Sequence, residues 1–220
     1  MMKRAIRIAL LGAESTGKTR LAAELAAHLR AQGQTVAAVP EALREWCIHE
    51  GRTPRPDEQM AIALEQARRV DQAVAADIVI ADTAPLMTAV YSELLFGDCS
   101  LYDFALSHQR RYDLTLLTGL DLPWVADGLQ RDGPQVREPV DALLRAALAR
   151  AGLAYQVIYG TGAQRLANAL VAINSIAYNS GLSRATGGSD SSSEAKTAWS
   201  CDQCSDPDCE HRLFTGLLKR

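Results

Sequence analysis

The feature that most restricts how this chain can fold is an eight-residue loop near its start. Gly12–Thr19 reads Gly-Ala-Glu-Ser-Thr-Gly-Lys-Thr and fits the pattern G-x-x-x-x-G-K-[ST] without a mismatch. A largely apolar run of strand length, Ile6–Leu11, comes directly before it. The segment Lys18–Ala31 follows, with Leu21 and Leu25 at helical spacing. A buried strand that enters a helix through such a loop predicts the first unit of an α/β fold.

The residue types in this loop are those that a bound phosphate chain requires. Gly12 and Gly17 let the backbone turn tightly and approach an anion, so that successive N–H groups point at it. The ammonium of Lys18, one of only four lysines in the chain, is expected to reach the β- and γ-phosphates of ATP, and the Thr19 hydroxyl to coordinate Mg²⁺. The alternative is a plain glycine turn between a strand and a helix. The predicted ATP site comprises Gly12, Ala13, Glu14, Ser15, Thr16, Gly17, Lys18 and Thr19.

Strand-like and helical segments alternate along the rest of the first 178 residues. Further strands are expected at 35–39, 78–81, 114–117 and 155–159, and helices at 41–50, 57–76, 85–96, 101–110, 140–151 and 163–178. This alternation predicts a five-stranded parallel sheet covered on both faces, the three-layer sandwich of P-loop NTPases. We expect a domain over 1–178, a flexible Ser/Gly-rich linker over 179–198, and a cysteine-rich tail over 199–220.

A phosphate loop of this kind needs a carboxylate at the end of a neighbouring strand to hold Mg²⁺ through water. Asp82, which follows the apolar run 78–81, is the first candidate for this metal and catalytic role. The alternative is that it caps the helix that begins near Pro85. Asp121, in a turn after the fourth predicted strand, is the weaker competitor for the metal.

Residues for a phosphoryl acceptor are expected where the second strand ends, because open α/β sheets bind ligands at the carboxyl ends of their strands. Glu41 could take a proton from an attacking hydroxyl, and Arg44 lies one helical turn further on. The alternative for both is a solvated helix start with an ion pair. Gln66 and Arg69 share one face of a later helix and are expected at the surface.

A polar segment with glycines and prolines follows the fourth predicted strand. It contains Arg131 and Arg137, and arginines on a mobile flap can close over a transferring phosphoryl group and expel water. We therefore expect these two to act as lid arginines. The alternative is a polar surface loop.

Composition restricts the location and the partners of the chain. The net charge of −3 gives no global basic field for nucleic acid or anionic lipid, so we expect neither as a partner. No apolar stretch is long enough to span a bilayer, and the apolar start leads straight into the glycine loop. We expect a cytoplasmic protein that binds a small molecule.

Several segments in this order resemble the ribosylnicotinamide kinase domain of the NadR type, within the AAA-like P-loop ATPases. They are Gly-Ala-Glu-Ser-Thr-Gly-Lys-Thr at 12–19, Glu-Ala-Leu-Arg-Glu-Trp at 41–46, Glu-Gln-Ala-Arg-Arg-Val-Asp at 65–71, Ala-Asp-Thr at 81–83, Tyr-Asp-Leu-Thr-Leu-Leu at 112–117 and Trp-Val-Ala-Asp-Gly-Leu at 124–129. The resemblance covers roughly residues 4–172. It implies a nucleoside-kinase-like fold and ATP-dependent phosphorylation of the 5′-hydroxyl of nicotinamide riboside or a related ribonucleoside. It also favours Glu41 and Arg44 on the acceptor side, Asp82 near the metal, and Arg131 and Arg137 in the lid.

The chain departs from the family pattern at two positions. The family often has Asp-Thr-Asp after the third strand, and here Ala84 takes the place of the second carboxylate. The lid usually reads Asp-Gly-x-Arg, and here Gln130 stands in the arginine position. These departures motivate an alternative function, a regulatory ATPase or binding module that is switched by ATP and lacks kinase activity.

The tail offers four zinc ligands in a short span. Cys201 and Cys204 form a Cys-x-x-Cys pair, and Cys209 and His211 follow at a spacing shorter than usual. The sequence is compatible with a structural zinc knuckle that contacts a protein partner, or with an acidic tail that carries free thiols.

Overall fold

The structure, a computed structural model, describes residues 4–73, 75–125 and 134–179. The predicted cysteine-rich tail and nearly all of the linker, from residue 180 onward, lie outside the described residues. The same holds for Gln130 and Arg131, so the predicted lid arginine at 131 and the zinc ligands Cys201, Cys204, Cys209 and His211 stay predictions.

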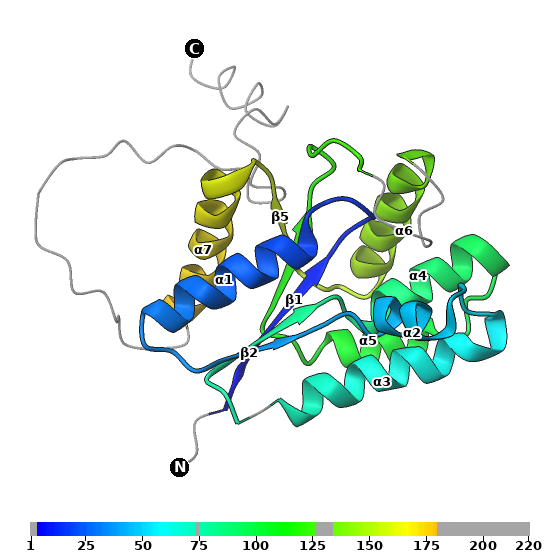
Figure 1. Ribbon diagram of the computed structural model, residues 1–220, viewed down its shortest axis with the longest axis horizontal. Coiled ribbons are helices and arrows are strands. Elements are labelled where there is room, and N and C mark those ends of the chain that lie inside the picture. The colour runs from blue at the N-terminus through cyan, green and yellow to red at the C-terminus, as the bar shows by residue number, and fades with distance from the viewer. Residues whose placement is uncertain (1–3, 74, 126–133, 180–220) are drawn as a thin grey trace, which may run out of the picture.

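The described residues form the predicted five-stranded parallel sheet with the strand order β2-β3-β1-β4-β5 (Figure 1). The strands are β1 Ile6–Leu11, β2 Val36–Val39, β3 Ile78–Asp82, β4 Leu114–Thr118 and β5 Gln156–Ile158. The helices are α1 Lys18–Ala31, α2 Ala42–Glu50, α3 Gln59–Gln72, α4 Pro85–Phe96, α5 Tyr102–Gln109, α6 Arg137–Arg150 and α7 Gly162–Asn179, with short 3₁₀ turns at η1 Pro56–Glu58 and η2 Pro134–Val136. None of these helices has the length and apolar composition that crossing a bilayer requires.

Two hydrophobic layers enclose the sheet because successive side chains of a strand point to opposite faces. In β1, Ile8 and Leu10 pack with α1 and α7, whereas Ala9 and Leu11 pack on the other face with residues of α4, α5 and α6. Figure 1 shows α1 and α7 on one side of the sheet and α3 to α6 on the other. The three-layer arrangement expected from the sequence is therefore confirmed.

Two helix boundaries differ from the sequence prediction by three residues or more. Helix α3 ends at Gln72 rather than at residue 76, although the following residues are mostly alanine. The chain must reach the sheet here, where the Asp77 carboxylate accepts hydrogen bonds from the backbone N–H and the hydroxyl of Thr35. Helix α6 begins at Arg137 instead of residue 140, and it tolerates Pro139 because the first turn of a helix needs no donor there.

The strand order gathers several loops at one edge of the sheet. The glycine loop follows β1, which lies between β3 and β4. The register places Leu10 beside Asp82 and Leu11 beside Leu117, so Asp82 and Thr118 end their strands on either side of that loop. The carboxyl edge of the central strands is therefore the position from which a ligand can touch all three.

Candidate active site

The glycine loop adopts a backbone that its residues explain. Gly12 has φ 143°, and a Cβ there would lie 2.1 Å from the Thr118 hydroxyl oxygen. Gly17 has φ 77°, in the left-handed region that favours glycine. The buried Thr16 hydroxyl donates to the carbonyl of Ala13 at 2.7 Å and lies 2.7 Å from the Thr118 hydroxyl. These contacts fix the loop against the end of β4.

The Lys18 ammonium lies against the first residues of the glycine loop. Its ammonium donates to the carbonyls of Gly12 and Ala13, both at 2.8 Å. Thr19 is exposed at the start of α1. The cleft beside these residues has a volume of about 360 Å³ and is lined by Ser15–Arg20, Arg44, Leu122, Pro123 and Val125. The structure therefore brings the predicted phosphate loop together with Arg44, which comes from a different helix.

Glu41 and Arg44 lie at the start of α2, as the sequence analysis placed them. Glu41 occupies the N-cap position but makes no capping hydrogen bond, and its Oε2 lies 3.4 Å from Nε of Arg44. The N–H of Ala42 donates instead to the Oε1 of Gln66 at 2.7 Å. Gln66 is 2% exposed, so its predicted surface position is wrong. The buried amide does the capping and leaves the Glu41 carboxylate to other contacts.

Asp82 ends β3 as a buried carboxylate that is 6% exposed. Its Oδ1 has no hydrogen-bond partner among the described residues, and the same is true of the buried hydroxyl of Thr83. Thr83 has φ 94°, a costly conformation for a β-branched residue. The N-cap of α4 is Ala84, so Asp82 does not adopt its alternative role as the cap.

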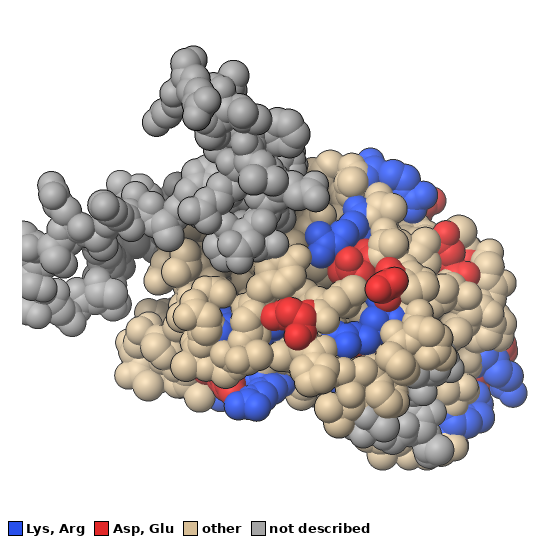
Figure 2. Space-filling model, turned by 90° about the horizontal axis from the view of Figure 1, so that it is seen from above, with Lys and Arg blue, Asp and Glu red and all other residues tan. Residues whose placement is uncertain are grey.

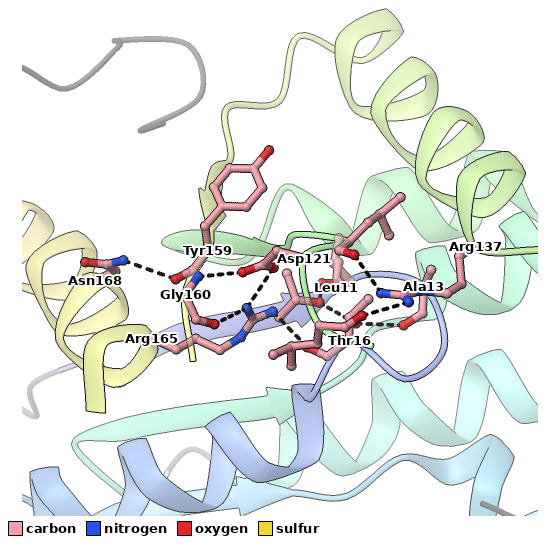
Figure 3. Close-up of polar contacts among 12 residues, drawn as sticks. Leu11, Ala13, Thr16, Asp121, Arg137, Tyr159, Gly160, Arg165 and Asn168 are labelled. Carbon is pink, nitrogen blue, oxygen red and sulfur yellow. Dashed lines mark hydrogen bonds and ion pairs between the residues drawn. The ribbon is translucent and has the colours of Figure 1, made fainter. Parts of the chain in front are cut away.

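Asp121, the second candidate for the metal, is engaged by protein donors (Figure 3). Its Oδ1 accepts from Arg165 Nη1 at 3.0 Å, and its Oδ2 accepts from the N–H of Gly160 at 2.6 Å. Arg165 is 4% exposed and also donates to the carbonyl of Thr16 at 2.8 Å. These contacts leave Asp82 as the better placed of the two carboxylates for a metal.

Arg137 is buried rather than free to move with a loop. It is the first residue of α6, is 8% exposed, and donates to the carbonyls of Leu120 at 3.1 Å and Leu122 at 2.8 Å. The prediction that it lies on an irregular flap is wrong, because the turn η2 and α6 incorporate it. Its guanidinium supports the segment that lines the cleft.

The same segment is tied to the glycine loop from its other end. The Ser15 hydroxyl donates to the carbonyl of Val125 at 2.6 Å and lies 3.1 Å from its backbone nitrogen. Viewed from above relative to Figure 1, the coloured surface carries basic and acidic side chains next to one another (Figure 2). The basic side chains that line the cleft are Lys18, Arg20 and Arg44.

Thr118, Gln66 and Arg165 contribute to this site and were not among the residues that the sequence pointed to. Each is a polar residue on a regular strand or helix, and its partner lies far away in the sequence: Thr118 meets Thr16, Gln66 meets Ala42, and Arg165 meets Thr16. Hydrophobic periodicity gives no signal for such pairs. The sequence shows only that Thr118 directly follows the predicted strand 114–117, and its place beside the loop comes from the structure.

A parallel sheet with a G-x-x-x-x-G-K-T loop at the carboxyl end of its central strand defines a P-loop protein. A family profile described as "AAA domain" matches residues 7–165, and the chain belongs to this family. The family membership expected from the sequence motifs is thereby confirmed. No curated protein sequence matches the chain.

Solved structures with the same fold include two of the NadR protein. One, in complex with NAD and AMP-PNP, has 19% identity and a TM-score of 0.61, and the other, in complex with NR, has 21% identity and a TM-score of 0.65. Each alignment covers 78% of this chain but only 49% or 50% of the NadR chain, so this chain spans about half of their length. A deoxyadenosine kinase from M. mycoides, with the products dcmp and a flexible dcdp bound, aligns over 77% of this chain and 100% of its own, at 14% identity and a TM-score of 0.54.

Proposed function

We propose that this protein transfers a phosphoryl group from ATP to a hydroxyl of a small nucleoside-like molecule, with nicotinamide riboside or a related ribonucleoside as the acceptor. The observation that carries the proposal is the cleft that joins the phosphate loop, with Lys18 at its mouth, to Arg44 of α2. The NadR complex with NR and the deoxyadenosine kinase complex show that proteins of this fold bind such acceptors or products.

The loop residues have distinct roles in this proposal. Backbone N–H groups of Gly12–Thr19 hold the β-phosphate, and the Lys18 ammonium reaches the γ-phosphoryl oxygens, where negative charge builds up during transfer. Arg44, which also lines the cleft, orients the acceptor or the γ-phosphate. Arg137 keeps the segment at 120–122 in place, and Arg131 stays the predicted lid arginine.

The residues at the loop fit a magnesium ion. Asp82 offers a buried oxygen with no partner among the described residues, and the Thr19 hydroxyl is exposed at the start of α1. In P-loop proteins Mg²⁺ is held by the phosphates together with one or two protein oxygens and water. When bound, magnesium neutralises charge on the β- and γ-phosphates.

The proposed transfer balances as a displacement at phosphorus. The acceptor hydroxyl oxygen forms a bond to the γ-phosphorus while the bond from that phosphorus to the β,γ-bridging oxygen breaks, and ADP leaves. The hydroxyl proton passes to a carboxylate, either Glu41 on the acceptor side or Asp82 beside the loop.

The direct test is ATP turnover with a panel of acceptors. Purified protein with ATP and Mg²⁺ is offered nicotinamide riboside, nicotinic acid riboside, adenosine and deoxyadenosine, and each phosphorylated product is measured by mass spectrometry. We expect a monophosphate from at least one riboside and none from the Lys18→Met variant. A protein that binds ATP tightly and phosphorylates none of the panel would contradict the kinase proposal.

Ala84, in place of a second carboxylate, favours a second candidate function. Here ATP binding would switch the protein between two states that a protein partner distinguishes, with the cysteine-rich tail as the contact. The cheap discriminating measurement is the capture of a partner with and without ATP. Equal capture under both conditions would count against this candidate.

A further inference from the structure

One buried arginine joins three loops at the carboxyl edge of the sheet (Figure 3). Arg165 lies in the first turn of α7, and its guanidinium donates to the Thr16 carbonyl at 2.8 Å, to the Gly160 carbonyl at 2.9 Å and to Asp121 Oδ1 at 3.0 Å. The second oxygen of Asp121 accepts from the Gly160 N–H at 2.6 Å. The phosphate loop, the segment after β4 and the loop after β5 are therefore linked through one side chain.

The contact with Thr16 has a direct consequence for the phosphate loop. In a trans peptide the carbonyl and the following N–H lie in one rigid plane and point in opposite directions within it. By holding the Thr16 carbonyl, Arg165 therefore fixes the direction of the Gly17 N–H, which points away from the arginine. Gly17 lines the cleft and has φ 77°. Because glycine adopts positive and negative φ about equally well, its own backbone does not select this conformation, and a contact from another residue must do so.

Because Arg165 is buried, its guanidinium depends on these protein acceptors. The Arg165 side chain is 5% exposed and that of Asp121 is 29% exposed, so the guanidinium cannot replace these partners with water. Breaking such a pair leaves a buried charge without compensation. The planar guanidinium reaches three acceptors on three segments, which a single ammonium on a flexible stem does not reproduce.

We propose that Arg165 is a positioning residue that presets the phosphate loop for the β-phosphate, with Asp121 holding the guanidinium in register and tying it to the loop after β5. The inference rests on the proposed binding of a nucleotide by this loop. It adds to the proposed function because Arg165 itself touches no reacting atom. Its effect should be specific to the phosphate part of the ligand, since the peptide that it orients belongs to the proposed phosphate loop and lines the cleft.

The test compares ligands with and without a β-phosphate in folded variants. Dissociation constants for ADP and AMP are measured by calorimetric titration and competition, for the wild type, Arg165→Met, Arg165→Lys and Asp121→Asn. The matched control is Arg145→Met, which breaks an arginine–carboxylate pair on α6, Arg145 to Asp141 at 2.6 Å, away from the loop. Thermal midpoints report how much each change costs the fold.

We expect Arg165→Met to weaken ADP binding about 30-fold, since misplacing a binding group by ~1 Å can cost on the order of 100-fold. AMP binding and all constants of the control should stay within about twofold, because only the β-phosphate uses the preset N–H groups. Arg165→Lys should recover part of the loss. Asp121→Asn should weaken ADP binding less than Arg165→Met does, because the amide oxygen still accepts from Arg165. The remaining loss arises because the amide NH₂ then faces the Gly160 N–H, which is also a donor.

Three outcomes separate this inference from the proposed function. A folded Arg165→Met variant with an unchanged ratio of ADP to AMP affinity overturns the inference even if the wild type is an active kinase. If that variant does not fold, Arg165→Lys decides the matter, because equal ratios in it and in the wild type overturn the inference as well. A wild type that binds ADP but phosphorylates no nucleoside overturns only the proposed function.

Discussion

The two edges of the sheet use the same residue types for different purposes. At the amino edge, Arg7 in β1 and Arg111 after α5 both pair with the Asp71 carboxylate, at 3.0 and 2.8 Å. At the carboxyl edge, Arg165 and Arg137 direct most of their hydrogen bonds to backbone carbonyls of loops. Arg7 and Arg111 therefore join side chains at one edge, whereas Arg165 and Arg137 mainly hold backbone at the other.

The difference follows from what each edge must do. The cleft at the phosphate loop lies at the carboxyl edge, whereas the charge pairs at the amino edge hold strands and helices together. At the carboxyl edge, irregular loops must present N–H groups in fixed directions, and buried guanidinium groups supply the donors that those carbonyls need. Changes at the amino edge should therefore act on stability, and changes at the carboxyl edge on binding and turnover.

The largest effect is expected at the phosphate loop. Lys18→Met should lower kcat/KM about 1,000-fold, because the ammonium stabilises charge that develops during transfer. The thermal midpoint should move by no more than about 3 °C, since the hydrogen bonds of the ammonium to Gly12 and Ala13 lie within its own loop. Arg30→Met, at the far end of the same helix, is the control for turnover. An unchanged kcat/KM in Lys18→Met would contradict the view that the carboxyl edge serves turnover and the amino edge stability.

The amino edge should respond to pH through His108, which is 4% exposed. Burial, together with the charges of Arg111 and Arg7, lowers the pKa of His108 to about 4, and Asp71 acts in the opposite direction. The unfolded chain therefore binds a proton below pH 6.5 that the folded chain does not bind until about pH 4. Stability should fall as the pH drops across this window, by roughly 3 kcal/mol from this group.

His108→Phe removes the titrating ring while keeping an aromatic side chain next to Tyr112, whose ring centroid lies 5.4 Å away. The urea midpoint of this variant should depend less on pH between 6.5 and 4 than that of the wild type. Ligand binding near neutral pH should not change, because the ring lies at the amino edge. Parallel stability curves for the two proteins across this window would show that His108 does not titrate as described.

Asp71→Ala should cost about 2 kcal/mol, because it leaves Arg7, whose side chain is only 12% exposed, without its carboxylate. A domain of this size then loses about 6 °C in its thermal midpoint. The KM values for both substrates should stay within about twofold. A variant that keeps its stability but binds ATP poorly would mean that the two edges are not separable in this way.

Most of the fold could be predicted from the sequence because strands and helices depend on local patterns. The apolar runs 6–11, 78–81 and 114–117 all became strands, and the spacing of leucines predicted α1. The errors at the end of α3 and at the start of α6 lie where tertiary contacts decide. The Asp77 carboxylate accepts a hydrogen bond from Thr35, and the Arg137 guanidinium donates to the carbonyls of Leu120 and Leu122.

The site could be predicted where its residues form local motifs or, like Asp82, directly follow an apolar strand. Gly12–Thr19 and the pair Glu41 and Arg44 form local motifs, and the structure places Arg44 with the loop in one cleft. Asp121 appeared in the sequence as a competitor for the metal because its partners, Arg165 and Gly160, lie about 40 residues further along. Contacts of this kind depend on the strand order, which spacing alone does not reveal.

The smallest effect is expected for a change at Gln66. It tests whether the start of α2, at the carboxyl edge, acts on the KM for the acceptor alone. Gln66→Met removes the acceptor for the N–H of Ala42, which is 3% exposed and cannot turn to water. The start of α2 should then shift, and the KM for the acceptor nucleoside should rise about tenfold, since an unpaired buried donor costs about 1–3 kcal/mol. The KM for ATP should not change, because the phosphate loop has separate supports.

Two further variants show whether Gln66 acts through the start of α2. Gln66→Glu keeps an oxygen for the Ala42 N–H and should restore part of the acceptor KM. Arg69→Met, one turn further along α3, breaks a partly exposed pair with Glu45 of α2 and should leave both KM values nearly unchanged. If all three variants changed the two KM values alike, α2 would be only a structural element, and Glu41 and Arg44 would lose their place on the acceptor side.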